Sequence, residues 1–244
     1  MRNIVFTIAY DGTNYHGWQC QPNALTIQEV LNRTVGKILD HPVRIHAAGR
    51  TDAGVHAMGQ VVNFHTENPM ELRSLARGLN SLLPRDIRLQ DAREEVITFH
   101  ARYSAKTKTY AYCILNTPYG SPFLERYTWH IHHVVNVAAM NDAARVVIGE
   151  HDFSAFKKKD EIYNSPVREI VRAGVKRKGD LIYFIVEARG FLRYMVRNIM
   201  GTLVLVGSGK IMEDDFSAVL ESKEREKAGP TAPARGLFLR KIKY

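Results

Sequence analysis

The segment from Gly49 to Ala57, G-R-T-D-A-G-V-H-A, holds the residues of this chain whose types and spacing best suit chemistry. It places a cation (Arg50), a carboxylate (Asp52) and an imidazole (His56) among small residues directly after a predicted strand, where a rigid element can present side chains to a ligand. A carboxylate there can act as a nucleophile or as a general base. Because an Asp among small residues before Gly is also a common turn, an ordinary turn stays open on spacing alone.

Other motifs match ligand or cofactor sites only in part. The run from Gly207 to Lys210 lacks the glycine spacing of a phosphate-binding loop and favours a helix C-cap and turn. His65-Thr66-Glu67 matches half of a zinc deaminase motif, which two isolated cysteines cannot complete. The histidines between 130 and 133 have no carboxylate at ligand spacing, and Arg189-Gly190-Phe191 begins like an RNA-recognition motif but then departs from it. The sequence therefore predicts no metal and no cofactor.

The charge balance points to a polyanionic partner. Lys and Arg number 34 against 25 Asp and Glu, a formal net charge of +9 in a chain that is 45% hydrophobic and therefore expected to fold. Basic residues cluster at 157–159, 168–178 and 235–243, and the 11–23 loop, with Tyr15, His16 and Trp18, looks exposed and aromatic. RNA is favoured over DNA because no helix-turn-helix, zinc finger or basic zipper is present.

The sequence also indicates a compartment. The first twelve residues lack the apolar region of a signal peptide, and no run approaches the roughly 18 apolar residues of a membrane span. Cys20 and Cys113 are too few for a disulfide framework. We therefore expect a cytoplasmic protein with no membrane association.

The elements that must position the candidate residues follow a β-α-β-β-α-β order twice. In the first half, hydrophobic periodicity predicts strands at 4–9, 43–47, 60–65 and 87–93 and helices at 27–39, after a capping box at Thr26, and 72–83. In the second half it predicts strands at 110–115, 167–175, 181–187 and 237–242 and helices at 137–148 and 191–206.

This order predicts an α+β fold of two split-βαβ (ferredoxin-like) halves. The expected domains are 1–103, which carries the Asp52 segment, and 104–244, which carries Tyr110 and Arg197, with a linker at 99–109. We expect antiparallel sheets joined edge to edge, helices on one face, and an active-site cleft between the halves.

The Asp52 segment and six further motifs together resemble the tRNA pseudouridine synthase A family over nearly the whole chain. The six motifs are Y-D-G-T-N-Y-H-G-W-Q at 10–19, G-Q-V-V at 59–62, F-H-A-R-Y at 99–103, D-F-S-A-F at 152–156, M-V-R-N-I at 195–199 and T-A-P-A-R-G-L at 231–237. The resemblance implies a homodimeric, cofactor-free isomerase that converts uridines at positions 38, 39 and 40 of the tRNA anticodon arm to pseudouridine.

By this resemblance, Asp52 is the catalytic aspartate, either as a nucleophile or as the base that starts an elimination; the sequence does not choose between the two routes. Arg50 would hold the gap that the flipped uridine leaves in the stack, with a surface phosphate contact as the alternative. Tyr110 would stack on uracil and help to remove the proton at carbon 5, unless it is simply a core aromatic of its strand.

Arg197 lies in an apolar helix, so its charge is expected to have a buried partner, and the resemblance makes Asp52 that partner. Arg193, one turn earlier, could equally be the partner. One departure from the family is Lys108, where many relatives place Arg two residues before the active-site tyrosine. A lysine cannot form the planar bidentate contact of an arginine.

Two other functions share part of this pattern. A non-catalytic RNA-binding module would keep the basic surface without needing Asp52, Tyr110 and Arg197. A metal-dependent nuclease would need clustered carboxylates. Asp214 and Asp215 are adjacent, but they stand at a predicted helix start, where capping explains them better.

Overall fold

In the computed structural model, which describes residues 1–244, the chain forms ten strands and five α-helices, and the predicted α+β fold class is confirmed. The chain divides into two compact units, residues 1–106 with 239–244 (unit 1) and residues 107–238 (unit 2). Most strand pairs within each unit are antiparallel.

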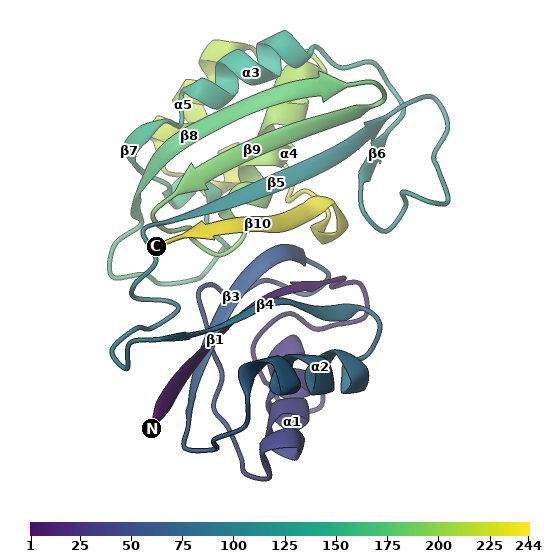
Figure 1. Cartoon of the computed structure of the whole chain (residues 1–244). Coiled ribbons are helices and arrows are strands. Elements are labelled where there is room, and N and C mark those ends of the chain that lie inside the picture. Colours follow the sequence, from purple (N-terminus) through teal and green to yellow (C-terminus); the bar gives the residue numbers. More distant parts are fainter. The chain divides into compact units, whose positions relative to one another are not determined.

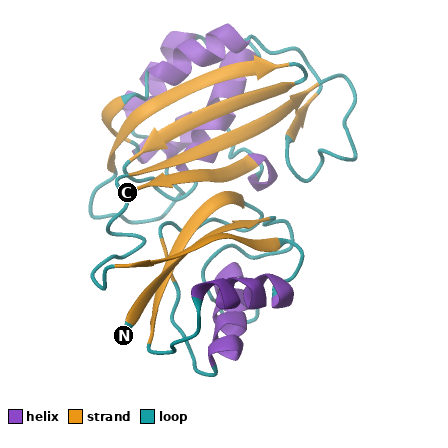
Figure 2. Cartoon of the chain, in the orientation of Figure 1, coloured by secondary structure: helices purple, strands orange, loops and turns teal.

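Unit 1 has the predicted β-α-β-β-α-β order (Figures 1 and 2). Its elements are β1 (Arg2–Tyr10), α1 (Ile27–Leu39), β2 (His46–Ala47), β3 (His56–Thr66), α2 (Leu72–Leu82) and β4 (Ile87–Glu95). β1 is central and pairs antiparallel with β3 and with β4, while the short β2 pairs with β3.

Capping and apolar spacing account for the two helices of unit 1. The Thr26 hydroxyl accepts a hydrogen bond from the Glu29 backbone N–H at 3.4 Å, and α1 then buries an apolar stripe that includes Ile27, Leu31 and Val35. α2 ends at Leu82, two residues before Pro84, because proline cannot continue a helix. α1 therefore begins where the sequence predicts it, and α2 ends one residue before the predicted end.

Unit 2 is built on the antiparallel strands β5, β9, β8 and β7, with β6 parallel to β5. Its elements are β5 (Thr107–Asn116), β6 (Trp129–Ile131), α3 (Val137–Arg145), β7 (Gly149–Asp152), β8 (Val167–Lys178), β9 (Leu181–Ala188), α4 (Met195–Gly207), α5 (Glu213–Ser222) and β10 (Leu237–Lys243), whose last residues belong to unit 1. The three helices lie on one face of the strands (Figure 1). α4 contacts α3, α5 and β5, so nearly all of its side chains are buried.

Two predicted elements begin at other residues than expected. The strand predicted at 43–47 is paired only at His46 and Ala47, because the Ile45 N–H bonds to the Asn32 side chain of α1 instead of to a strand. The helix predicted from residue 191 begins at Met195, since Tyr194 has a left-handed backbone (φ 66°) that a helix cannot pass through.

Other predictions were too long or absent. The predicted helix at 137–148 ends at Arg145, where Val146 and Ile148 donate to carbonyls three residues back and tighten the chain out of α-helical geometry. The sequence analysis missed β6 and β7, which are short, and predicted only the start of α5, at Asp214 and Asp215. At the start of α5 the Asp215 side chain accepts from the Met212 N–H at 2.7 Å, so the capping role expected there is confirmed for Asp215.

Candidate active site

Asp52 lies in the loop that joins β2 to β3, and this loop is fixed mainly through its backbone. The Val55 N–H donates to the Asp52 carbonyl at 3.1 Å, closing a turn in which Gly54 has a φ of 75°, a conformation that glycine adopts without strain. The buried Thr51 hydroxyl lies 2.8 Å from the Tyr10 hydroxyl. The Gln60 amide donates to the Gly49 carbonyl at 2.6 Å. Asp52 itself is half-buried, so its carboxylate is presented from a rigid turn.

The 11–23 loop packs against the Asp52 loop. The Trp18 N–H donates to the Thr51 carbonyl at 3.0 Å, and the Gly54 N–H donates to the Tyr15 carbonyl at 3.2 Å. The expectation that this loop exposes its aromatic residues is wrong for Tyr15 and Trp18, which are 5% and 2% exposed, and right for His16. Both rings are buried next to the Asp52 loop. The Tyr15 hydroxyl donates a hydrogen bond to the Asp86 carboxylate at 2.7 Å.

The buried His56 side chain connects the 11–23 loop to the Asp52 loop. It is 1% exposed, and its Nδ1 lies 3.0 Å from the Gly12 N–H donor and 3.1 Å from an Asp11 carboxylate oxygen. A Cβ added at Gly12 would lie 2.1 Å from the Val55 carbonyl oxygen, so only glycine allows this approach. The imidazole of the G-R-T-D-A-G-V-H-A motif therefore holds the Asp11–Gly12 turn against the Asp52 loop.

The two phenols beneath the loop are neutral at physiological pH. Burial raises the pKa of Tyr10 to about 12, although the Thr51 hydrogen bond acts in the opposite direction. Burial, with Asp86 adding to it, also raises the pKa of Tyr15. Both hydroxyls therefore act here as hydrogen-bonding groups. Arg50, two residues before Asp52, is exposed at the surface of the same loop.

In unit 2, Tyr110 lies on β5 opposite Val186 of β9. Its side chain is 7% exposed, and its ring meets the edge of the Phe191 ring at a centroid distance of 5.1 Å and an interplanar angle of 85°. Lys108 lies two residues earlier on the same strand, opposite Ala188. Phe191 thus fixes the orientation of the Tyr110 ring within unit 2.

Arg197 lies in the first turn of α4 and is half-buried. Its Nε donates to the Ala232 carbonyl at 2.7 Å, and the Ala232 N–H donates back to the Arg197 carbonyl at 3.1 Å. The guanidinium carbon also lies 4.8 Å from the centroid of the Tyr194 ring, within cation-π distance. Arg193 lies before the helix, is exposed, and reaches the same ring at 5.4 Å.

A buried polar network that the sequence analysis missed holds the 229–232 segment against α4. The fully buried Asn198 donates to the Phe156 and Lys157 carbonyls at 2.8 and 3.1 Å. Its Oδ1 accepts from the Thr231 hydroxyl at 2.7 Å and from the Arg225 guanidinium at 3.1 Å. The signals for it were the polar residue inside the apolar M-V-R-N-I helix and the T-A-P-A-R-G-L motif, which meet at this point.

The predicted site residues divide between the two units. Arg50 and Asp52 share one loop of unit 1, while Tyr110 and Arg197 lie on separate elements of unit 2. The predicted ion pair between Asp52 and Arg197 stays a prediction, as does its alternative with Arg193.

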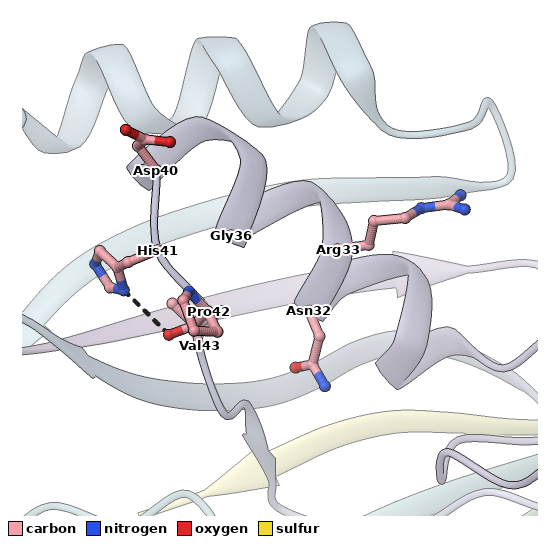
Figure 3. A pocket seen from close by; sticks show the side chains of 7 residues that line it. All are labelled: Asn32, Arg33, Gly36, Asp40, His41, Pro42 and Val43. Carbon is pink, nitrogen blue, oxygen red and sulfur yellow. Dashed lines mark hydrogen bonds between the residues drawn. The ribbon is translucent and has the colours of Figure 1, made fainter.

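A hollow of about 510 Å³ lies at the end of α1 (Figure 3). It is lined by Asn32, Arg33, Gly36, Asp40, His41, Pro42 and Val43. Its one imidazole is already engaged, since the His41 ring nitrogens lie 3.1 Å from the Pro42 carbonyl and 2.9 Å from the Thr66 hydroxyl. This hollow contains none of the candidate catalytic or binding residues.

No group of three or more His, Cys, Asp or Glu side chains is placed to hold a metal ion. The histidine cluster of unit 2 is engaged in other contacts, with His130 bonded to the Thr117 carbonyl at 2.8 Å and His133 to the Ser208 hydroxyl at 2.8 Å. None of the helices combines the length and the apolar character needed to cross a membrane.

Known proteins resemble this chain along its whole length. Residues 7–104 and 143–244 match a family model described as tRNA pseudouridine synthase. The chain is 48% identical to the tRNA pseudouridine synthase A of Thermoanaerobacter sp. (strain X514) and 42% identical to that of Acetivibrio thermocellus, in each case over all of both chains. A solved structure of an H/ACA RNP bound to a substrate RNA containing 2'-deoxyuridine shows 15% identity and a TM-score of 0.40, over 83% of this chain and 43% of that chain.

Proposed function

Because the chain belongs to the tRNA pseudouridine synthase family and is an enzyme that isomerises uridine in tRNA, we propose that it acts on uridines 38, 39 and 40 of the anticodon arm with Asp52 as its catalytic residue. The single observation that carries the proposal is the complete G-R-T-D-A-G-V-H-A segment, folded as a fixed turn that presents Asp52, in a chain matched over its full length to this family. The family match favours an isomerase over the RNA-binding module and the nuclease.

The reaction explains why a carboxylate is the central group. The bond between the ribose and uracil nitrogen 1 must break, the base must turn, and a bond between the ribose and uracil carbon 5 must form, with a proton leaving carbon 5. The net change is an isomerisation with neither oxidation nor hydrolysis. Asp52 can serve either as a nucleophile toward ribose or uracil or as the base that removes a sugar proton.

Arg50 is proposed to stabilise the flipped state of the substrate. A uridine in a stem or loop must leave its stack to reach a carboxylate, which costs a few kcal/mol. Arg50 is exposed on the Asp52 loop, so its long side chain can enter the space that the base vacates. The planar guanidinium suits this position because it can stack on neighbouring bases and bond to phosphate.

Tyr110 and Arg197 are the proposed substrate-binding residues of unit 2. Tyr110 is proposed to stack on the turned uracil and to help remove the proton from carbon 5, and its contact with Phe191 supports a fixed ring orientation. Arg197 is proposed to pair with Asp52 and to keep that carboxylate ionised and oriented. The bond from its Nε to the Ala232 carbonyl supports this role, because it holds the guanidinium in one orientation.

A homodimer and a cytoplasmic location complete the proposal. Both cysteines are free thiols, which suits a reducing compartment. Sedimentation velocity at micromolar protein tests the assembly, and a monomer at all concentrations would contradict the dimer.

The first experiment is nucleoside analysis of an unmodified tRNA transcript after incubation in EDTA, with pseudouridine resolved by chromatography. The wild type should convert uridine, while Asp52→Asn should yield no product and bind the tRNA within a few fold of wild type. Transcripts with single uridines at positions 38, 39 or 40 test the positions. Retained turnover in Asp52→Asn would overturn the assignment of Asp52, and product at other positions would overturn the anticodon-arm assignment.

A further inference from the structure

The F-H-A-R-Y motif of unit 1 has no part in the proposed chemistry, yet buried side chains hold it in place. The Asn3 amide donates to the Phe99 carbonyl at 2.8 Å, and the Asn63 side chain accepts from the Ala101 N–H at 2.9 Å. Both asparagines are at most 1% exposed. The turn formed by residues 99–104 is therefore a rigid part of the unit rather than a loose linker.

Two further contacts fix the same turn. The Tyr244 hydroxyl donates to the Ala101 carbonyl at 2.9 Å, and the Tyr244 and Phe99 ring centroids lie 4.9 Å apart. Within the turn, the Arg102 N–H donates to the His100 Nδ1 at 3.1 Å, which sets the orientation of the imidazole. The side chains that this turn displays are thus held before any ligand arrives.

The turn displays a row of flat rings that ends in solvent. The His46 and His100 centroids are 4.9 Å apart, and the His100 and Tyr103 centroids are 4.5 Å apart. Tyr103 is 77% exposed, although burying a tyrosine ring normally stabilises a protein. The Arg102 guanidinium carbon lies 5.7 Å from the Tyr103 ring centroid. An exposed aromatic ring beside a cation on a fixed turn is a good surface for stacking a nucleobase.

The charged groups that act on the two imidazoles are basic. Burial first, then the neighbouring charges of Arg44, His65 and the other imidazole, lower the pKa of His46. Burial also lowers the pKa of His100, with Arg102 and His65 adding to the effect. A phosphate near these groups would relieve their mutual repulsion. A single-stranded segment of nucleic acid offers both flat base rings for stacking and phosphates for these basic groups.

The position of the ring row suits the same RNA that reaches Asp52. His46 of β2 pairs with Asn63 of β3. Three positions away on the same strand, the Gln60 side chain bonds to Gly49 at the start of the Asp52 loop. β2 therefore leads from the ring row at His46 toward the Asp52 loop. Asp52 lies six positions after His46, a chain length that spans at most about 20 Å. One folded tRNA can cover both places.

We propose that the 99–104 turn, together with Arg44 and His46, is a second RNA-binding site, where an unpaired base of the bound tRNA stacks on Tyr103 and adjacent phosphates contact Arg44 and Arg102. The identity of the RNA as tRNA rests on the family assignment. The site would add affinity and help to orient the substrate without touching the reacting uridine.

Equilibrium binding of a fluorescein-labelled, unmodified tRNA transcript to Asp52→Asn protein tests this proposal without turnover. In that background Tyr103→Ala should bind about 5-fold or more weakly, the loss expected for one base–aromatic stack, while Tyr103→Phe should bind as tightly as its parent. Tyr119→Ala is the matched control, because Tyr119 is 86% exposed in unit 2 and lies outside the turn. Melting curves should be unchanged, since the Tyr103 ring is in solvent.

Three outcomes would overturn the proposal, each in a distinct way. Unchanged binding of Tyr103→Ala would remove the stacking site, and equal losses in Tyr103→Ala and Tyr103→Phe would replace stacking by a hydroxyl contact. A shift of Tyr103→Ala to a smaller species in sedimentation would make the surface a contact between two copies of the chain. A wild type that binds tRNA through Tyr103 but forms no pseudouridine would contradict the proposed function and leave this site standing.

Discussion

The Asp52 loop of unit 1 and the Arg197 region of unit 2 hold their key side chains by different means. The Asp52 loop is fixed by backbone hydrogen bonds, by glycines at close contacts and by buried rings beneath it. Arg197 lies on a regular helix, and its Nε donates to the Ala232 carbonyl. Side-chain hydrogen bonds centred on Asn198 hold the 229–232 segment that carries this carbonyl.

This difference predicts different weaknesses. A loop held mainly through its backbone is most sensitive to an added Cβ where two backbones touch. A helix braced by a buried polar network loses stability when one member is removed, because the remaining groups stay buried without partners. The most damaging substitutions should therefore be steric in unit 1 and polar in unit 2.

The largest expected effect is that of Gly12→Ala. Its Cβ would lie 2.1 Å from the Val55 carbonyl oxygen, so the 11–23 loop and the Asp52 loop must separate. We expect a loss of roughly 3 kcal/mol or more in the free energy of unfolding, measured by urea denaturation, and little turnover by the folded fraction.

Gly78→Ala in α2 is the control for this steric effect. A Cβ at Gly78 would meet only the Ile38 side chain at 3.6 Å, so the helix should gain up to about 1 kcal/mol. If Gly12→Ala were as stable and active as Gly78→Ala, the loop would not be held by close backbone contact.

Asn198→Ala should have the next largest effect and should act through side chains. It removes hydrogen bonds to Thr231, Arg225 and two carbonyls, at a cost of about 2 to 4 kcal/mol in stability. Because the 229–232 segment then moves relative to Arg197, kcat should fall more than KM rises. Asn141→Ala on α3 is the matched control, since the Asn141 Oδ1 accepts one bond, from the Val175 N–H, and should cost about 1 kcal/mol.

Arg197→Lys separates the two candidate partners of Asp52. A lysine cannot bond to the Ala232 carbonyl through an Nε and still offer two parallel donors, so kcat should fall about 10- to 100-fold. Arg193→Lys, at an exposed position before α4, should change kcat less than about 3-fold. The reverse ranking in single-turnover assays would move the pairing role to Arg193.

Much of the fold could be predicted because local signals and tertiary structure agree. Thr26 caps the start of α1 and Pro84 follows α2, as the capping box and the apolar spacing indicate. The predictions that failed depend on distant contacts or on one unusual dihedral angle. β2 is short because Ile45 bonds to α1, and α4 starts late because of the left-handed Tyr194.

The candidate site shows the same division. The position of Asp52 in a loop after a strand could be predicted, because its motif is contiguous. The burial of Tyr15 and Trp18 could not, since their polar neighbours suggest an exposed loop and only the Asp52 loop above them makes it a core. The Asn198 network joins residues 156, 198, 225 and 231, which no local pattern connects.

The smallest expected effect is a change in how the stability of unit 1 depends on pH. Burial lowers the pKa values of His46 and His100, so the folded protein binds fewer protons than the unfolded chain below the unfolded pKa of about 6.5. The titration of these two imidazoles therefore lowers the stability of the fold as the pH falls through about 6.5. The melting temperature of the double variant His46→Gln/His100→Gln should fall less between pH 7.5 and 5.5 than that of the wild type.

The control is His16→Gln, at an exposed position of the 11–23 loop, which should follow the wild type. An equal pH slope in all three proteins would mean that folding does not change the protonation of these two imidazoles.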